Sequence, residues 1–582
     1  MYEIFDGIKI NYQEGQKAEL LQVDTIENEI TIYRFHLSWN STNTEQDDDF
    51  TLEWTYPIKD GLYRWTPISH QNRFLPPAWT EYEVSMISRG APICSHYDGN
   101  GMNHYTWGLS ECSKTIFYKS GVIEQNGWLQ NCFRIPVKQY TNQFETDVMI
   151  YIDTRRIPFG KSIADIACWW DKSIGMRPII APDAAYEPVY SFWYSYHQDI
   201  SEEIVEEECR RAKELGFDIC IVDDGWQTDT NCGGYAYCGD WKPAELKFPN
   251  MRQHVQRVHD IGMKYMLWFS VPFLGEFAEN YSEFKDMFLR WKKHFRCGVL
   301  DPRYRKVREF LVGIYVKALS EWDLDGMKLD FIDEWRQDSD NAPYHPNMDI
   351  PVLTDAVDVF MTEVINALRN IKPDVLIEFR QNYIGPNMCK YGNMFRVTDC
   401  PYDYTKNRVG VLDLRMQMQN SAVHSDMLMW NEGISPEMAA VQIINVMFGV
   451  MQYSARLEHM TEALASMSKF WLAFLKDHSE LLLKGELSAY DAQFLYTWAK
   501  SVKGKECAVG VFANEKCVQP DCVDTIYIAN GTTSERVLVD LEDDYKVTFI
   551  DCFGNKISKE EIRFSGINSV LIPIGGLAIF NK

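Results

Sequence analysis

Charged residues end several short apolar runs in the middle of this chain, and their types suit acid and nucleophilic chemistry. Asp223 and Asp224 follow ICIV, Lys328 and Asp330 stand in GMKLDF, and Asp399 follows MFRVT. Two carboxylates that face each other across a pocket, one ionised and one able to carry a proton, are the groups that glycoside hydrolysis needs. The elements that carry these residues must therefore bring them to one place.

Lys328 and Asp330 are two residues apart, so in a strand both side chains point to the same face. Burying two charges under a layer of helices would be costly, which favours the open end of a barrel. An ammonium beside a carboxylate lowers the pKa of the acid and keeps it ionised, which suits a nucleophile. A structural ion pair explains the two residues equally well. Asp399 on another strand, with Arg396 just before it, favours catalysis.

The run Asp223-Asp224-Gly225-Trp226 places carboxylates and a ring together. Such a combination grips sugar hydroxyls against an apolar surface. Trp193 and Trp268 end two further predicted strands. Isolated acids at strand ends usually cap the next helix, and we assign that role to Asp333, Asp403 and Asp413.

No metal or cofactor is expected. Cys232 and Cys238 lack a second pair at ligand spacing, and the 12 histidines do not cluster. His424 with Asp426 could form a ligand pair, but a hydrogen-bonded histidine is the preferred interpretation. The sequence also lacks a glycine-rich phosphate loop and a GxSxG motif.

The pattern of elements predicts three domains. Residues 1–182 alternate short β-like runs with turns, which predicts a β-sandwich, and the runs are ITIYRFHLSW, FTLEWTYP, WTEYEVSMIS, CFRIPVKQY and TDVMIYID. Residues 183–482 alternate apolar runs with amphipathic helices, which predicts a (β/α)8 barrel whose active site lies at the carboxyl ends of the strands. The last two barrel strands are expected at HSDMLMW and IINVMFGVMQ. Residues 483–582 predict a smaller β-sandwich.

Two helix boundaries are suggested by local residues. Asp199 with Glu202 three positions later resembles an N-cap arrangement, and Gly216 stands where a left-handed residue ends a helix.

The composition limits which binding partners and which cellular compartment we expect. The net charge of −25 argues against nucleic acid and anionic membranes as partners and favours a neutral or cationic ligand. The 15 cysteines are scattered, the first residues contain no basic or apolar leader, and no apolar run approaches the roughly 20 residues of a membrane span. We expect a cytoplasmic protein with free thiols.

The order of the motifs resembles the α-galactosidase clan, glycoside hydrolase families 27 and 36, and is closer to family 36. The motifs lie between residues 188 and 460 and read FWYSY, VDDGW, GDW with KFPN, GMKYMLWF, LDPRYRKVREFL, GMKLDF and RVTD. The resemblance implies that Asp330 is the nucleophile and that Asp399, beside Arg396, is the general acid/base. It also implies that Lys328 reaches the sugar. Further substrate contacts carried over from the family are Asp223, Asp224, Trp226 and Trp241.

Two segments depart from the family pattern. Family 36 proteins have a cysteine and a glycine-rich turn after strand five, where the 2-position of the sugar is contacted, whereas this chain has EFRQNYIGPN with Arg380 and Asn382 at the mouth. After strand three it has FSVPFLGEF in place of an acidic E-P-E type segment.

The resemblance implies a retaining, exo-acting α-galactosidase that takes small α-linked oligosaccharides and forms a homo-oligomer. The alternatives are an α-N-acetylgalactosaminidase, a transglycosylase, or a non-catalytic carbohydrate-binding protein.

Overall fold

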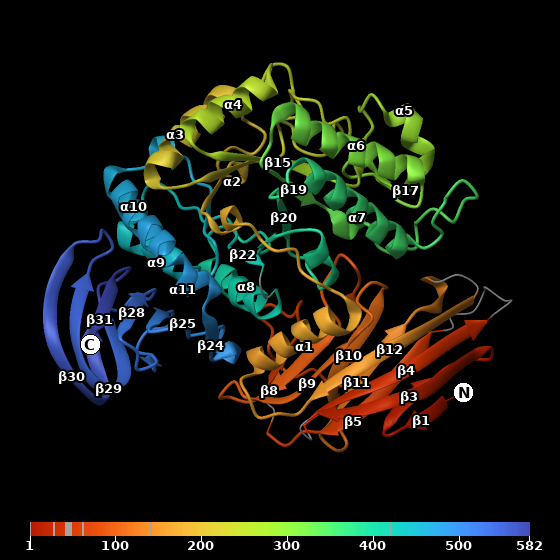
Figure 1. Ribbon diagram of the computed structural model, residues 1–582, viewed down its shortest axis with the longest axis horizontal. Coiled ribbons are helices and arrows are strands. Elements are labelled where there is room, and N and C mark those ends of the chain that lie inside the picture. Colours follow the sequence, from red (N-terminus) through yellow and green to blue (C-terminus); the bar gives the residue numbers. More distant parts are fainter. Residues whose placement is uncertain (1, 27–28, 41–48, 61–62, 140–142, 419–420) are drawn as a thin grey trace.

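The N-terminal part of the computed structural model is a pair of facing β-sheets (Figure 1). The structure describes residues 2–26, 29–40, 49–60, 63–139, 143–418 and 421–582. One sheet has the order β1 (Tyr2–Phe5), β2 (Ile8–Asn11), β5 (Phe50–Pro57), β11 (Trp128–Ile135), β10 (Ile116–Ile123) and β7 (Glu83–Ser85). The other has the order β3 (Gln16–Ile26), β4 (Ile30–Asn40), β12 (Gln143–Asp153), β9 (Asn103–Leu109), β8 (Ile93–Tyr97) and β6 (Tyr63–Trp65).

Alternation of buried and exposed residues explains this sandwich. In β5, Phe50, Leu52 and Trp54 are buried, whereas the residues between them are partly exposed. They join one core with side chains of the opposite sheet, such as Phe35 and Trp107. The expected β-domain is therefore confirmed, although only Glu83–Ser85 of the expected segment WTEYEVSMIS forms a strand, and Met86 adds an isolated bridge to Arg89.

Helix α1 (Phe159–Ile174) connects the sandwich to the barrel. Its buried face includes Ile163, Ile166 and Trp170, and the Trp170 indole donates to the Leu109 carbonyl at 2.9 Å. These side chains belong to the same apolar core as the barrel, so the two domains pack without a solvent layer between them.

Eight parallel strands form the central barrel, as expected from the sequence (Figure 1). Their order is β22 (Ala422–His424), β21 (Met394–Arg396), β20 (Leu376–Arg380), β19 (Gly326–Asp330), β15 (Lys264–Ser270), β14 (Ile219–Val222), β13 (Val189–Ser191) and β23 (Gln452–Tyr453). Isolated parallel bridges, His424 to Val450 and Leu428 to Tyr453, close the barrel between its last two strands.

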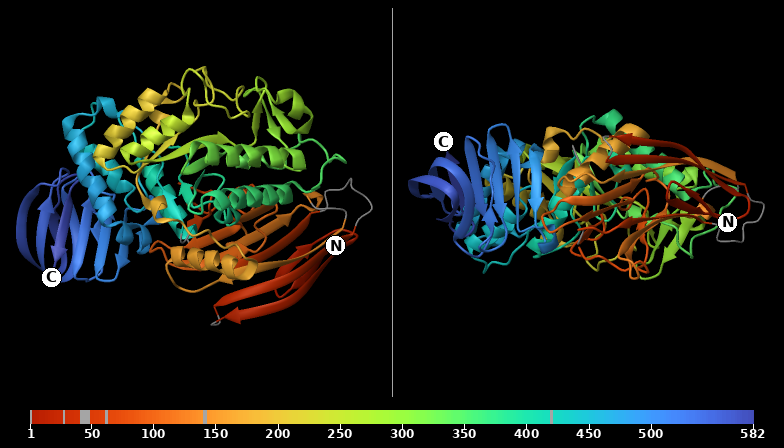
Figure 2. Two further views of the ribbon diagram at one scale, coloured as in Figure 1. Left: turned by 45° about the horizontal axis from the view of Figure 1, so that its top comes forward. Right: turned by 90° about the horizontal axis from the view of Figure 1, so that it is seen from below.

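Helices surround this barrel on the outside, as Figures 1 and 2 show. They are α3 (Glu202–Leu215), α4 (Met251–Ile261), α6 (Arg305–Trp322), α7 (Leu353–Ile371), α8 (Tyr404–Gln417), α9 (Pro436–Asn445), α10 (Glu462–Asp477) and α11 (Ser479–Lys484). Short helices α2 (Trp193–Tyr196) and α5 (Tyr281–Phe284) lie in loops. A small antiparallel sheet of β16 (Phe273–Gly275), β18 (Cys297–Leu300) and β17 (Phe288–Lys292) follows β15. Within the described residues, no helix has the length and apolar character needed to cross a bilayer.

Some local predictions are wrong. The N-cap of α3 is Ser201, whose side chain accepts from the Ile204 amide, and not Asp199; Gly216 does end that helix in a left-handed conformation. Strand eight is Gln452–Tyr453, because residues 436–445 of the preceding apolar segment form helix α9. Ser435 caps this helix and Pro436 begins it, and burial on all sides hides its helical period.

The C-terminal β-domain is also present, and its strands form one hydrogen-bonded sheet rather than two separate sheets. The order is β24 (Glu486–Tyr490), β25 (Trp498–Lys503), β26 (Glu506–Val511), β28 (Thr525–Asn530), β31 (Leu577–Asn581), β29 (Arg536–Ile550) and β27 (Cys517–Val518), with β30 (Lys556–Leu571) paired to β29. The domain limits at 182 and 482 stay predictions.

Asp413 joins all three domains. Asp403 caps α8, as predicted, by accepting from the Lys406 amide, but Asp413 lies within that helix. Its carboxylate accepts from Arg73 of the N-terminal domain at 2.8 and 2.9 Å and from the Tyr496 hydroxyl at 2.5 Å. The Trp65 indole donates to it at 3.0 Å. A buried carboxylate therefore holds the domain junction, and its predicted capping role is wrong.

Candidate active site

Asp330 ends β19 at the carboxyl end of the barrel and is almost fully buried. Its Oδ2 accepts from the Trp268 indole at 2.9 Å, and its Oδ1 accepts from the Tyr383 hydroxyl. Arg380 Nη2 lies 3.1 Å from the same Oδ1. Burial raises the pKa of Asp330, but Arg380 and then Lys328 outweigh burial and bring the pKa below its usual value. Asp330 is thus an ionised, oriented carboxylate.

Lys328 contacts a different acid from the one expected. Both Lys328 and Asp330 are buried on one strand, yet Lys328 Nζ donates to Oδ2 of Asp223 at 2.6 Å. Asp223 follows β14, which is separated from β19 by β15, and the long lysine side chain spans that gap. Arg380, from the adjacent strand β20, is the cation in contact with Asp330. Lys328 acts on Asp330 only at longer range, through its charge.

Asp224 is held next to this pair. Its carboxylate accepts from Gln198 at 2.8 Å and from Gln227 at 2.6 Å. Burial raises the pKa of Asp224 to about 6, against the opposing effect of these two amides. The following Gly225 has φ 122°, and a Cβ there would lie 2.6 Å from the Gln198 backbone, so only glycine fits the turn.

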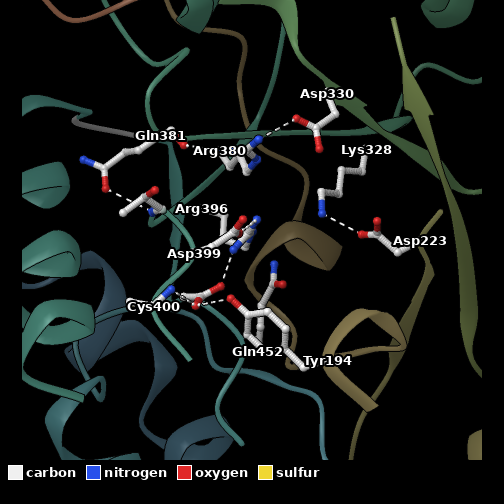
Figure 3. Close-up of polar contacts among 12 residues, drawn as sticks. Tyr194, Asp223, Lys328, Asp330, Arg380, Gln381, Arg396, Asp399, Cys400 and Gln452 are labelled. Atoms are coloured by element: carbon white, nitrogen blue, oxygen red, sulfur yellow. Dashed lines mark hydrogen bonds and ion pairs between the residues drawn. The ribbon is translucent and has the colours of Figure 1, made fainter. Parts of the chain in front are cut away.

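Asp399 lies three residues beyond β21 and is more accessible, with 43% of its side chain exposed. Arg396 Nη2 donates to its Oδ1 at 2.9 Å (Figure 3). The same guanidinium bonds the buried Asp426. Burial raises the pKa of Asp399, but Arg396, Arg380 and Lys328 together hold it well below its usual range. The predicted pairing of Arg396 with Asp399 is present in the structure.

The two carboxylates differ in their exposure, although the pKa values of both are lowered. Asp330 is buried and contacted by Trp268, Tyr383 and Arg380, whereas Asp399 is more exposed and is bonded by Arg396. Arg380 is close enough to both that its charge lowers both pKa values. A fixed anion and a solvent-facing carboxyl group are suited to nucleophilic attack and to proton transfer, respectively.

The tryptophans divide into a buried layer and one partly exposed ring. Trp226 is fully buried, stacks on Trp241 at 5.8 Å and donates to the Trp268 carbonyl at 2.9 Å. Trp226 therefore supports Trp268, which in turn bonds Asp330, and it has no surface for a sugar in this conformation. Trp241 and Trp268 are also buried. Trp193, in α2, is partly exposed with its ring against His197.

Several residues of this centre were not predicted. Tyr383, Gln198 and Gln227 lie in loops, where no periodicity marks them, and only their positions after strand ends connect them with the site. Asn382, which was predicted, lines a small cavity with Ile68 and His70 of the N-terminal domain.

One candidate metal ligand from the sequence, His424, is hydrogen-bonded to the backbone. His424 is buried, its Nε2 lies 2.8 Å from the Ala185 carbonyl oxygen, and burial lowers its pKa to about 3, which fits the hydrogen-bonded histidine expected. Among the described residues, Glu202, Glu206 and His254 lie close enough together to bind a metal ion. Arg257 already pairs with both glutamates there.

The barrel with its two β-domains has the multidomain fold of the family 36 glycoside hydrolases. Residues 176–379 match the family model described as Melibiase, which confirms the resemblance in the barrel. The galactosidase domain of alpha-galactosidase-sucrose kinase AgaSK superimposes with a TM-score of 0.67 at 13% identity, covering 99% of this chain and 82% of that one. For an AgaA variant from Geobacillus stearothermophilus in complex with raffinose, the TM-score is 0.66 at 14% identity, covering 99% and 81%.

Curated relatives with sequence similarity are alpha-galactosidases. Mel36A of Lactobacillus acidophilus is 29% identical over 147 residues, which are 24% of this chain and 20% of that protein. Alpha-galactosidase 2 of Pediococcus pentosaceus is 27% identical over 148 residues, with the same shares. The matched segment thus spans 20% of the length of these relatives, so their activity is a proposal for this chain.

Proposed function

We propose that this chain is a retaining, exo-acting α-galactosidase that hydrolyses small α-linked oligosaccharides. The observation that carries the proposal is the setting of Asp330, an ionised carboxylate held by Arg380, Trp268 and Tyr383, with Asp399 on a neighbouring part of the same barrel mouth. The similarity to alpha-galactosidases and the raffinose bound by the AgaA variant support the substrate class.

In the first step, Asp330 attacks the anomeric carbon and the bond to the leaving oxygen breaks. Asp399 donates its proton to that oxygen, which yields a covalent glycosyl-enzyme with inverted configuration. In the second step, Asp399 takes a proton from water while the water oxygen displaces Asp330. The two inversions retain the configuration overall. Such a mechanism requires the two carboxyl groups to lie about 5–5.5 Å apart.

The direct test is hydrolysis of nitrophenyl α-galactoside by the wild type and by Asp330→Ala, with NMR of the first-formed product. We expect the α-anomer from the wild type and a loss of at least about 10⁴-fold in kcat in the variant. Asp333→Asn, on the same loop, is the matched control and should keep most activity. Survival of activity in Asp330→Ala, or a β-anomeric first product, would contradict the assignment.

The same assay distinguishes the alternative specificities. The 2-acetamido analogue tests for an α-N-acetylgalactosaminidase, and an added sugar acceptor tests for transfer. Binding of galactosides without turnover would indicate a non-catalytic carbohydrate-binding protein.

A further inference from the structure

Strand β30 forms a long edge of the C-terminal sheet and pairs on one side. It runs from Lys556 to Leu571 and forms an antiparallel ladder with β29 along its length. Among the described residues, β30 pairs with no other strand, and Figure 1 shows it as the outermost strand of this sheet. Its outer row of backbone N–H and C=O groups is thus available to another strand, which is a hazard that folded proteins usually block.

The outward-facing side chains of β30 include large apolar ones. Phe564 and Val570 point to the core and are buried, whereas Ile557, Ile567 and Leu571 are 60–65% exposed. A long edge strand that exposes apolar side chains is the kind of strand that pairs with a further chain.

A second copy of β30 fits this edge because the strand is self-complementary about Ile562. When two such strands run antiparallel with Ile562 on the two-fold axis, each residue lies opposite the residue at the same distance on the other side of Ile562. Glu561 then lies opposite the partner's Arg563, and Ile557 lies opposite the partner's Ile567. The axis repeats both pairs, so the contact contains two ion pairs and two apolar pairs.

Neighbouring registers lack this match. An axis at Glu561 would set Lys559 against the partner's Arg563, which is repulsive. An axis at Glu560 would set Ile557 against the partner's Arg563, so an apolar side chain would lie opposite a charge.

Charges on β29 extend the pattern of the axis at Ile562. In the ladder between β29 and β30, Lys546 lies opposite Glu561 and Asp544 lies opposite Arg563. The row across the four strands of a dimer is then Lys546, Glu561, the partner's Arg563 and the partner's Asp544, with alternating sign. Opposite charges on opposed residues stabilise a sheet, whereas like charges destabilise it. Charges that served only to block the edge would need no such order.

We propose that β30 is the contact surface of a two-fold homodimer, in which the C-terminal sheets of two chains join into one sheet. A two-fold interface uses the same surface on both subunits, as this edge does. Hydrogen bonds between the two backbones supply affinity, and the opposed side chains fix the register.

The first test measures the dimer of the full chain by sedimentation velocity at micromolar concentrations. We expect the wild type to sediment with twice the mass of the 67.9 kDa chain. In Glu561→Lys and in Arg563→Glu, each dimer contains two pairs of like charges, so the dissociation constant should rise at least about tenfold. Lys505→Glu is the matched control, because it makes the same change of charge as Arg563→Glu at an exposed residue between β25 and β26. It should leave the dimer intact.

Mixing the two charge variants separates a broken interface from a damaged fold. In the mixed dimer the introduced lysine lies opposite the introduced glutamate, and the unchanged Arg563 lies opposite the unchanged Glu561. We expect the mixture to recover most of the wild-type affinity. A monomeric wild type, dissociation constants that neither variant changes, or a mixture that stays monomeric would overturn the proposal.

Cross-linking tests the register. Position 562 lies on the axis, so in Ile562→Cys the two thiols meet across the antiparallel pair, where the Cα separation of about 4.5–5.5 Å suits a disulfide. We expect oxidised glutathione to yield a covalent dimer of Ile562→Cys. Lys559→Cys should cross-link no more than the wild type, because its two copies lie far apart on either side of the axis. Absence of the covalent dimer in Ile562→Cys, or its formation in Lys559→Cys, would overturn the proposed pairing.

Discussion

Arg380 Nη2 lies 3.1 Å from Oδ1 of Asp330, and the charge of this guanidinium also acts on Asp399. One arginine on β20 thus influences both carboxylates of the proposed mechanism. In the free protein, kcat/KM requires Asp330 to be ionised and Asp399 to be protonated. Since both pKa values lie below their usual range, we expect an acidic pH optimum.

Removing the charge of Arg380 should shift the whole pH profile. The effect of burial is then opposed less strongly, so in Arg380→Gln the pKa values of Asp330 and Asp399 both rise. We expect the acidic and alkaline limbs of kcat/KM to move to higher pH. Arg380→Lys keeps the charge and should shift the profile less. Identical profiles for the wild type and Arg380→Gln would show that Arg380 does not set these pKa values.

Removing the Tyr383 hydroxyl should move only the acidic limb of the pH profile of kcat/KM. Its hydroxyl donates to Asp330 and thereby contributes to lowering the pKa of that carboxyl. In Tyr383→Phe the pKa of Asp330 rises, so the acidic limb of kcat/KM should move to higher pH while the alkaline limb stays. Tyr391→Phe is a suitable control, because the Tyr391 hydroxyl bonds Asp358 instead. Movement of both limbs would argue that the loop, rather than the hydrogen bond, has changed.

Asp399→Gly should make the rate depend on the leaving group. Without a proton donor, raffinose hydrolysis should fall by about 10²–10⁴-fold, the usual contribution of general acid catalysis. Formation of the glycosyl-enzyme from α-galactosyl fluoride needs no such proton, and added azide should restore turnover by replacing the activated water. Asp403→Asn alters the nearby helix cap and serves as the control. Equal losses on both substrates, without azide rescue, would exclude the acid/base role.

Asp413 should matter for stability rather than for chemistry. Asp413→Asn leaves the buried Arg73 without its counter-charge, and breaking a buried pair in this way costs about 3–5 kcal/mol. We expect a lower midpoint of thermal unfolding. The double variant Arg73→Met with Asp413→Leu removes both charges and should recover part of the loss. A midpoint unchanged in Asp413→Asn would show that the domain junction does not depend on this pair.

Backbone patterns predicted the fold well because they repeat. Eight alternations of apolar run and helix fix a barrel, and the rule that strand ends meet at one mouth then brings Asp223, Asp330 and Asp399 near one another. The sequence pattern is lost where a helix is buried on all sides, because its apolar residues then no longer recur with a helical period. Helix α9 is apolar on nearly all sides, so its segment was mistaken for part of strand eight.

Individual side-chain contacts were less predictable, because they depend on how far a side chain extends and on the conformation of loops. Lys328 is close to Asp330 in sequence, yet its four-carbon chain reaches Asp223, and Arg380 is the cation that contacts Asp330. Tyr383 follows β20 in a loop that has no period. Trp226 matched a sugar-binding motif, and in the structure its ring is buried and its indole donates to the Trp268 carbonyl, so its contact with a sugar stays a prediction.

The barrel can accept insertions most easily at the junction between β22 and β23. Among the described residues, these two strands are joined by isolated bridges, at His424 with Val450 and at Leu428 with Tyr453, and a cavity lined partly by residues 429–433 opens beside them. Strand β19, with Asp330, stands on the far side of the barrel order. Lengthening the loop at 429–433 would disturb few ladder partners there, so evolution or design can reshape this cavity without rebuilding the strand that carries Asp330.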